Sequence, residues 1–446
     1  MTDPIAIEFN DSGIIVCDNR QRLLNSPGYI ITLDTQQWLG KEARDRAFLH
    51  PNECNHRFWA QIARAKSDAV NHDNTRLALH HLESIWSKVS TNVDAVILTV
   101  PATFTKSGLG ILLGICKQLS IPVRAMIHNA ALSPRQAGHE GATVHIDMQL
   151  HHTAITQLDE KNKEFLVAHS EVLDQIGLHS LYAQAAEFIA QVFISNTRLD
   201  PLHSAELEQQ LFNNLPIWLQ AIQTQETVRC QLEYQNSSFE VTIESKGIKN
   251  ALKPQLSKIT NTLLSMGAAQ PVIACTSELL NRQLGFDQLV NDQGIMVRSL
   301  ITGHHAQQSL HHAEHILSHD DQVYLNKQLP YSVMTDALPS AKNVSTNTNE
   351  APTHILYRNN AYSLQEDLYV SESSQTKLRI HHEPEETPPP LLSIQTQSGA
   401  LTIKAFNHQE ITVNDQIVES YTQPVVGDSI RIAANADELV FIKVET

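Results

Sequence analysis

The stretch VHIDMQLHHTAITQL contains a carboxylate and two imidazoles at a tight turn between two predicted strands. Asp147 ends the first strand, and His151 and His152 precede the second. A turn of this kind binds phosphate when its backbone N–H groups are exposed, which glycine favours because it has no side chain. Gln149 and Leu150 occupy this turn instead, so we predict that it does not hold phosphate. We expect Asp147 to cap the turn and not to bind magnesium.

Histidines form a second group with chemical potential. The segment GHHAQQSLHHAEHIL places His311 and His315 four residues apart on a predicted helix, the spacing of a two-ligand zinc site. His304, His305 and His312 lie nearby in the sequence. The HExxH pattern is absent, and no cysteine or carboxylate set completes a coordination sphere. We therefore expect solvated helix histidines and no bound metal; a metal-binding sensor is the alternative.

Other catalytic patterns are missing from the sequence. The five cysteines are scattered and form no CxxC pair, so neither a disulfide framework nor a zinc knuckle is predicted. No GxGxxG, Walker A or nucleophile-elbow string occurs. The 16 glycines are roughly half the ~7% share of an average protein, which argues against several phosphate-binding loops.

The overall composition is that of a folded chain of two or three domains, with 446 residues, 41% apolar and 18% charged. The net charge of −16 removes most of the attraction to nucleic acid and anionic lipid, so neither is expected as a partner. No run of 18 apolar residues occurs, and MTDPIAIEFND lacks the basic and apolar regions of a signal peptide. We therefore expect a cytoplasmic protein without membrane insertion.

An α/β architecture must position these residues. Three short strands are predicted near the N-terminus, followed by a mostly helical segment from Trp38 to about Ser90. The three strands are Ile5–Ile7, Ser12–Asp18 and Tyr29–Asp34. The segment DAVILTV is then typical of a buried parallel strand, and a helix and a further strand follow it. This order implies a right-handed crossover.

The same order recurs further along the chain. The segments ATVHIDM, HHTAITQLD and EFLVAHSEV predict a second three-strand meander, followed by three helices and the buried strand PVIACT. We therefore predict a duplicated α/β domain over residues 1–336, with a cleft between its halves. Residues 337–354 are rich in Ser, Thr, Asn and Pro and are predicted to be a linker. Residues 355–446 contain short alternating segments and predict a small β-sandwich.

The segments SPGYIITLDTQQWLGKEARDRAFLHP, AVILTVPATFTKSG and IHNAALSP match, in order and spacing, motifs of the seventy-kilodalton heat-shock chaperones. The second segment corresponds to V-x-T-V-P-A-x-F in that family. Over about residues 5–335 the chain therefore resembles the nucleotide-binding domain of these chaperones, which belongs to the actin-like ATPase superfamily. The resemblance implies a two-lobed, ribonuclease H-like fold and a site for ATP with magnesium between the lobes.

The phosphate-binding motifs of that family are changed in this chain. The first, I-D-x-G-T-T, reads IEFNDS here, so Glu8 replaces the metal-side aspartate and Asn10 replaces a glycine. Asp11 adds negative charge where the phosphates would lie. The second motif, D-x-G-G-G-T, keeps Asp147, and its threonine corresponds to Thr153 or to the residue before it. Phosphoryl transfer depends on positioning and charge neutralisation, so we predict that it is lost.

Three further motif positions are also changed. Ala130 replaces the glutamate of N-E-P and cannot position a water molecule or assist a metal. No lysine occurs where the family has its catalytic lysine, and Arg57 and Trp59 stand near that place. The adenosine motif, G-G-x-S in the family, reads ACTS here.

The segment EITVNDQIVESYTQPVVGDSIRIAA resembles the end of a forkhead-associated domain through Asn414, Gly427 and Asp428. Ser371 and Glu372 stand where that family has the Gly and Arg of its I-G-R loop, and the S-x-x-H motif has no match. Phosphate recognition needs an arginine or equivalent donors, so the acidic residue argues against phosphopeptide reading. A generic β-sandwich with an Asn turn and a Gly-Asp turn is the alternative.

These changes predict a degenerate chaperone-type actin-like protein, or pseudo-ATPase, without catalytic residues or an expected cofactor. It would act as a scaffold or regulatory partner of another protein, for which a catalytically intact actin-like chain is one candidate. The alternative is an atypical ATP-binding protein with weak or no hydrolysis, which would bind ATP with magnesium. Its cleft would be lined by Asn10, Asp11, Ser12, Asp147, Thr153, Thr276 and Ser277.

Overall fold

The computed structural model divides the chain into two compact units, Met1–Asp336 and Ala337–Thr446. Each unit has a hydrophobic core of its own. The structure describes residues 4–34, 36–66, 71–91, 93–136, 138, 140–267, 271–291, 293–317, 323–334, 352–357, 360–364, 366–373, 377–382, 390–397, 400–406, 411–413, 416–418, 420–422, 424, 428–432 and 438–442. Most of the predicted linker, residues 337–351, lies outside these ranges.

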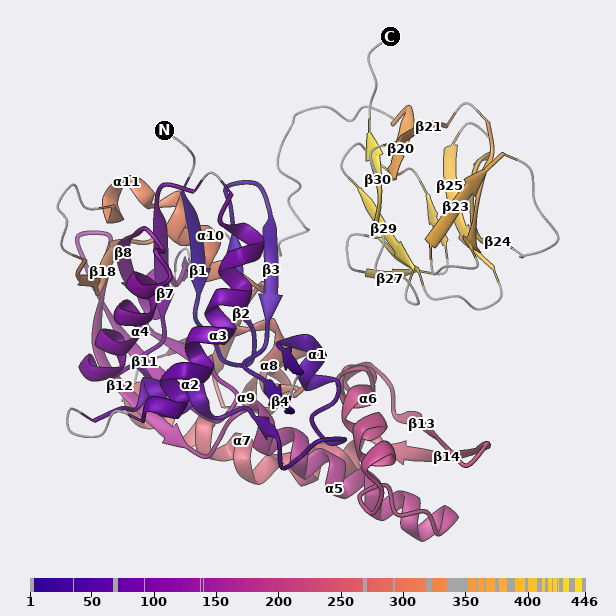
Figure 1. Ribbon diagram of the computed structural model, residues 1–446, viewed down its shortest axis with the longest axis horizontal. Coiled ribbons are helices and arrows are strands. Elements are labelled where there is room, and N and C mark those ends of the chain that lie inside the picture. The colour runs from indigo at the N-terminus through magenta and orange to yellow at the C-terminus, as the bar shows by residue number, and fades with distance from the viewer. Residues whose placement is uncertain are drawn as a thin grey trace. The chain divides into compact units, whose positions relative to one another are not determined.

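The first sheet of the first unit is mixed and has six strands (Figure 1). In sheet order they are β17 (Leu325–Asn326), β8 (Val123–His128), β7 (Val96–Val100), β1 (Ile5–Glu8), β2 (Ile14–Cys17) and β3 (Arg22–Ser26). Strands β1, β2 and β3 form an antiparallel meander, β7 runs parallel to β1, and β8 runs parallel to β7. The order of the predicted crossover is therefore present.

The third strand of this meander differs from the prediction. It is β3, a largely exposed strand without the apolar alternation that would mark it in the sequence. The predicted strand Tyr29–Asp34 contains β4 (Ile30–Thr32), which pairs with β5 (Gln37–Leu39) and β6 (Cys54–Asn55) in a separate small sheet. The segment predicted to be mostly helical therefore contains two strands besides α1 (Lys41–Arg44), α2 (Phe58–Ala63) and α3 (His72–Val89).

Strand alternation sorts the side chains of β1 onto two faces. Ile5 and Ile7 share a core with residues of α3 and of α4 (Lys106–Gln118). Ala6 lies in a different core with residues of α10 (His304–His311) and α11 (Ala313–Ile316). Glu8 follows the same alternation as Ala6, so its side chain is directed to the face that α10 covers.

The second sheet is also mixed and has six strands. In sheet order they are β16 (Ile295–Leu300), β15 (Val272–Ser277), β10 (Ala142–Met148), β11 (His152–Lys161), β12 (Glu164–Asp174) and β18 (Gln328–Pro330). Strands β10, β11 and β12 form an antiparallel meander, β15 runs parallel to β10, and β16 runs parallel to β15. The first and second sheets therefore share a strand order, apart from the edge strands β17 and β18.

Helices cover one face of the second sheet, where Val144, Ile146 and Met148 of β10 belong to a large apolar core. Of the helices in this core, α7 (Ser245–Gly267), α8 (Glu278–Arg282) and α9 (Phe286–Asn291) pack against the sheet, while α5 (Leu178–Thr197) packs against α7, and α6 (Ala205–Thr224) packs against α5 and α8. His145 and Asp147 alternate with the apolar residues and therefore lie on the opposite face. Further short elements are η1 (Asn129–Leu132), β9 (Arg135–Gln136) and β19 (Val333–Met334), and the hairpin of β13 (Thr227–Tyr234) and β14 (Ser237–Glu244) was not predicted.

The second unit contains two antiparallel sheets, as the short alternating segments predicted. The six-stranded sheet has the order β21 (Asn360–Ser363), β20 (His354–Tyr357), β30 (Glu438–Ile442), β29 (Ser429–Ile432), β26 (Ile411–Val413) and β27 (Gln416–Val418). The five-stranded sheet has the order β23 (Lys377–His381), β22 (Leu368–Ser373), β24 (Pro390–Gln397), β25 (Ala400–Ala405) and β28 (Ser420–Thr422). Buried residues of both sheets, such as Ile355 and Leu392, form one core.

Candidate functional site

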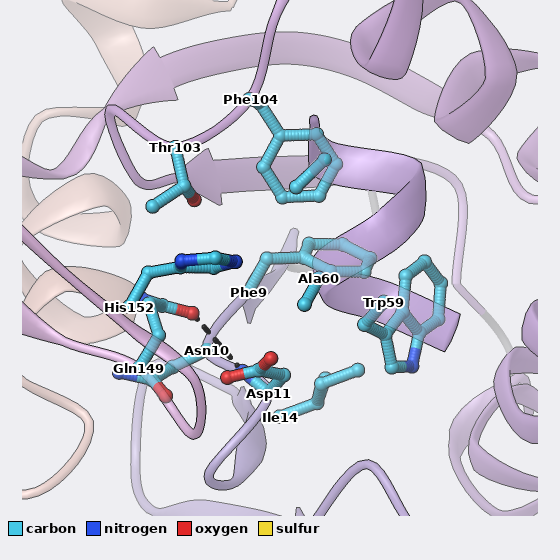
Figure 2. A pocket seen from close by; sticks show the side chains of 11 residues that line it. Phe9, Asn10, Asp11, Ile14, Trp59, Ala60, Thr103, Phe104, Gln149 and His152 are labelled. Atoms are coloured by element: carbon cyan, nitrogen blue, oxygen red, sulfur yellow. Dashed lines mark hydrogen bonds between the residues drawn. The ribbon is translucent and has the colours of Figure 1, made fainter. Parts of the chain in front are cut away.

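The turn between β1 and β2 contacts the turn between β10 and β11 directly. Asn10 Nδ2 donates to Asp147 Oδ1 at 3.1 Å and to the carbonyl of Met148 at 2.9 Å. The N–H of Asp11 donates to Gln149 Oε1 at 3.1 Å, and Figure 2 shows these two residues side by side. These bonds join residues 137 or 138 positions apart in the sequence. The two sheets are therefore connected directly through these two turns.

The carboxylate of Asp147 is buried, and both of its oxygens accept hydrogen bonds from amides. Oδ1 accepts from Asn10 and from Gln149 Nε2, the latter at 2.7 Å, and Oδ2 accepts from Asn129 Nδ2 at 2.7 Å. Burial raises the pKa of Asp147, while the charge of His305 and the hydrogen bonds from the amides oppose the rise. Hydrogen bonds to Asp147 thus connect the two turns to η1, and each carboxylate oxygen of Asp147 accepts from at least one protein donor.

Asp11 supplies a second buried carboxylate to the contact and is 6% exposed. It accepts a hydrogen bond from the backbone N–H of Leu150. Burial raises the pKa of Asp11 to about 7, the hydrogen bond from Leu150 opposes this rise, and the charge of Asp147 adds to it. A phosphate placed here would face this carboxylate without a compensating cation, which is unfavourable.

The N-terminus of α5 is also occupied by the second turn. The N–H groups of Leu178 and His179 donate to the carbonyls of Gln149 and Leu150 at 3.0 and 2.9 Å. Such N–H groups form a natural anion-binding site when they are free. A Cβ atom at Gly177 would lie 2.6 Å from the carbonyl oxygen of Leu150, so only glycine permits this close packing. The α5 terminus therefore binds protein carbonyls in place of a phosphate.

The remaining predicted cleft residues take different roles. Ser12 donates from Oγ and N–H to Asn10 Oδ1, at 2.7 and 2.9 Å, and joins the contact in this way. Thr153 Oγ1 donates to the carbonyl of Ile176 at 2.8 Å. Thr276 is buried without a hydrogen-bond partner for its Oγ1 in the described part of the chain, and Ser277 precedes α8 without capping it. The structure thus connects Asn10, Asp11, Ser12 and Asp147, and leaves Thr153, Thr276 and Ser277 outside this network.

The space between the two turns is a cavity of about 10 Å³ (Figure 2). It is lined by Phe9, Asn10, Asp11, Ile14, Trp59, Ala60, Ala63, Thr103, Phe104, Gln149 and His152. A volume of this size holds about one water molecule, whereas ligand pockets typically measure ~300–1,000 Å³. ATP with magnesium is far larger than this cavity.

Aromatic rings close the first-sheet side of the cavity. The ring of Phe9 makes edge-to-face contacts with Trp59 and Phe104, at centroid distances of 5.4 and 6.2 Å. Trp59 is anchored by a 2.9 Å hydrogen bond from its Nε1 to His81 Nδ1. Trp59 stands near the place where the chaperone resemblance expects the catalytic lysine, so this region offers an apolar ring and no charged donor.

A buried ion pair lies beside the contact, on the α10 face of β1. His305 Nδ1 lies 2.7 Å from Glu8 Oε1, and the N–H of Ala306 donates to Glu8 Oε2 at 3.1 Å. Burial disfavours ionisation of Glu8, but the charge and hydrogen bond of His305 outweigh it and lower the pKa of Glu8. Burial likewise opposes protonation of His305, and Glu8 raises the pKa of His305 above its ordinary value. The expectation of a solvated His305 is wrong, because α10 packs against β1.

Three further imidazoles meet between the two halves. The rings of His56, His151 and His179 have centroid distances between 4.7 and 5.4 Å, and His56 Nδ1 lies 3.0 Å from His151 Nε2. Burial lowers the pKa of His56 to about 4 and that of His151 to about 3, and it also lowers the pKa of His179. At neutral pH these rings are therefore uncharged packing groups.

The histidine-rich segment does not form one helix. Helix α10 ends at His311 and α11 begins at Ala313, so His311 and His315 lie on different elements. The rings of His312 and His315 are 6.2 Å apart. Within the described ranges, no group of three or more His, Cys, Asp or Glu residues is arranged to hold a metal ion.

Neither a protein-family model nor a curated protein matches this chain. No helix in the described part of the chain is long and apolar enough to cross a membrane. The geometry of the two contacting turns is therefore the basis for assigning a function.

Proposed function

We propose that this protein is a degenerate chaperone-type actin-like protein, a pseudo-ATPase that serves as a scaffold or regulatory partner of another protein. Both sheets of the first unit have a three-strand meander followed by two parallel strands, which is compatible with a duplicated actin-like domain. Side chains stand where the phosphate-binding turns of such a domain would have glycines.

The observation that carries this proposal is the direct bonding of the two turns. Phosphate binding needs free N–H donors and room for the anion. Here the N–H groups of Asp11 and Leu150 donate to Gln149 and Asp11 across the contact, and the cavity left beside them is about 10 Å³. Side chains of the protein itself thus occupy both the donors and the space that ATP would require.

A domain held in one arrangement offers a constant surface to a protein partner. Since the two halves of the first unit are joined without a ligand, nucleotide hydrolysis is not needed to fix their relative position. A catalytically intact actin-like chain is one candidate partner, by analogy with other pseudoenzymes. The role that follows is structural or regulatory.

We further propose that the second unit is a forkhead-associated-like, protein-binding arm. Its antiparallel sheets of six and five strands are compatible with that fold. Ser371, at the glycine position of the I-G-R loop, is buried in β22, and its Oγ contacts His381 Nε2. Asp428 is also buried, whereas Asn414 and Gly427 lie outside the described residues. The buried Ser371 offers no exposed group for a phosphate contact at this position.

A nucleotide titration tests the pseudo-ATPase proposal. Purified full-length protein is titrated with Mg-ATP and Mg-ADP in a calorimeter, and its thermal unfolding is recorded with and without millimolar nucleotide. A ligand at a hundredfold excess over its Kd raises the apparent stability by roughly 2.7 kcal/mol. We expect neither heat nor a thermal shift. Heat together with a shift would replace this proposal with the atypical ATP-binding protein.

A further inference from the structure

Two buried carboxylates lie near the ends of β1 and β10. Glu8 and Asp147 lie on the sheet faces that the large helical layers do not cover, and Asn10, two residues after Glu8, bonds directly to Asp147. Their charges act on each other, because Glu8 contributes to the raised pKa of Asp147. Buried carboxylates of like charge need a nearby cation to remain ionised.

The metal implied by the chaperone resemblance does not fit between these carboxylates. Glu8 Oε1 and Oε2 are engaged by His305 and by the N–H of Ala306. Asp147 Oδ1 and Oδ2 are engaged by amides of Asn10, Gln149 and Asn129. A divalent ion would have to displace several of these buried hydrogen bonds before it could bind.

We propose that the imidazole of His305 is the cation of this site, standing where the chaperone-like site would hold a metal, so that the two halves stay joined without magnesium or nucleotide. This inference rests on the proposed function and specifies what controls the same site. The closure of the site then depends on a side chain that is always present, and not on a diffusible ligand.

The surroundings of His305 favour a positive charge on this histidine above its neighbours. Glu8 and Asp147 both raise its pKa against the opposing effect of burial. The neighbouring imidazoles have lowered pKa values. Burial lowers the pKa of His128 and of His304 to about 4. Burial also lowers the pKa of His145, whose ring centroid lies 4.9 Å from that of His305. Among these four rings, His305 alone bonds to Glu8 and has its pKa raised.

The position of α10 places His305 next to Glu8. Gly303 precedes the helix with a φ of 85°, and a Cβ at this position would lie 3.3 Å from Cys17 Sγ. Helix α10 follows β16 of the second sheet in the chain, yet it packs against β1, β2 and β7 of the first sheet. The Glu8–His305 pair therefore ties the segment that leaves the second sheet to the end of β1.

A double-mutant cycle on the full-length protein tests the inference. His305→Gln, Glu8→Gln and the double variant are compared with the wild type by urea denaturation. His305→Gln leaves Glu8 buried without its cation, so the unfolding equilibrium constant should rise on the order of 10²-fold or more. In the Glu8→Gln background, His305→Gln should raise the unfolding equilibrium constant only roughly tenfold or less. His304→Gln, which removes a neighbouring neutral imidazole, is the matched control and should also cost roughly tenfold or less.

The inference would be overturned if His305→Gln raised the unfolding equilibrium constant equally in the wild type and in the Glu8→Gln background. If the variants do not fold, ¹⁵N spectra of histidine-labelled wild type at pH 8 decide instead: an imidazolium at His305 supports the inference, and a neutral ring overturns it. Magnesium chloride alone, at millimolar concentration, should not change wild-type stability, and a stabilisation would also overturn it. Binding of Mg-ATP to the wild type would overturn the proposed function, whereas absence of coupling between Glu8 and His305 would overturn this inference alone.

Discussion

The two turns that meet between the sheets have equivalent places in their meanders and contribute similar groups, but these groups bond in different ways. The β1–β2 turn supplies the amide of Asn10 and the carboxylate of Asp11, whereas the β10–β11 turn supplies the amide of Gln149 and the N–H of Leu150. Across the contact, the amide of Asn10 donates to Asp147, whereas the amide of Gln149 accepts from the N–H of Asp11. The two turns satisfy each other because each offers a donor where the other offers an acceptor.

This difference explains how a polar contact can be buried without a ligand. Buried polar groups cost free energy unless they form hydrogen bonds. Asp147 is satisfied by amides from the first turn, from its own turn and from η1. The complementarity of the turns can be tested by removing its parts one at a time.

Removing the shared acceptor should have the largest effect. Asp147→Ala leaves the side-chain amides of Asn10, Gln149 and Asn129 without their acceptor, so we expect a loss of about 3 kcal/mol or more in the free energy of unfolding. Urea denaturation measures this loss. Asp174→Ala, at a side chain that is 60% exposed, is the control and should cost about 0.5 kcal/mol or less. Similar small losses for both variants would contradict the central role of Asp147.

Adding a methyl group at Gly177, which packs closely against the second turn, should have the next largest effect. In Gly177→Ala the new methyl group meets the backbone of residues 149–151 at 2.6–2.8 Å, and we expect a loss of about 2 kcal/mol. Gly110→Ala is the matched control, because Gly110 lies inside α4 and a Cβ there meets nothing within 4 Å. That variant should be more stable than the wild type by up to about 1 kcal/mol. A neutral Gly177→Ala would show that the turn can move away from α5.

Neutralising the first turn should stabilise the protein at high pH. The pKa of Asp11 is raised to about 7 in the folded state, so the folded protein holds this proton more tightly than the unfolded chain does. Stability is therefore lost as pH rises from about 4 to about 7. Asp11→Asn has no proton to lose and should exceed the wild type by about 1–2 kcal/mol at pH 8, with a smaller difference at pH 4. A difference independent of pH would rule out this titration.

The histidine cluster should produce the smallest effect, on the acid side. The pKa of His179 is lowered by burial and by the charge of Arg57. The contribution of His179 to stability is therefore present when the pH is above the ordinary pKa of histidine, and it is lost as the pH falls below that pKa. His179→Gln should reduce the slope of the unfolding free energy against pH by up to about 1.4 kcal/mol per unit as the pH falls below about 6.5. An unchanged slope would mean that His179 stays accessible to protons when folded.

Much of the secondary structure was predictable because it depends on local patterns. The buried strands β7, β10 and β15 are continuous apolar or alternating segments, and α4, α5 and α6 have apolar residues at helical spacing. Strand β3 was missed because its residues are mostly exposed. The break between α10 and α11 was missed because the histidine spacing alone describes an uninterrupted helix.

The candidate site was only partly predictable. Asn10, Asp11 and Asp147 were named because they occupy the positions of the chaperone phosphate motifs, and the resemblance implied that these positions line one cleft. Asn129 and His305 were not assigned to the site, since η1 and α10 reach it through packing. A buried polar residue such as His305 has no sequence signal that distinguishes it from a solvated one.

The sequence by itself determined most of the buried strands and long helices, the side chains that stand where the resemblance has glycines, and the positions of the acidic residues. Only the tertiary structure decided which groups satisfy one another: Asn10 with Asp147, Asp11 with Leu150, and Glu8 with His305. The partners in these pairs are 137, 139 and 297 residues apart. Hydrogen bonds over such separations depend on strand register, turn closure and helix packing together, which no local pattern of residues specifies.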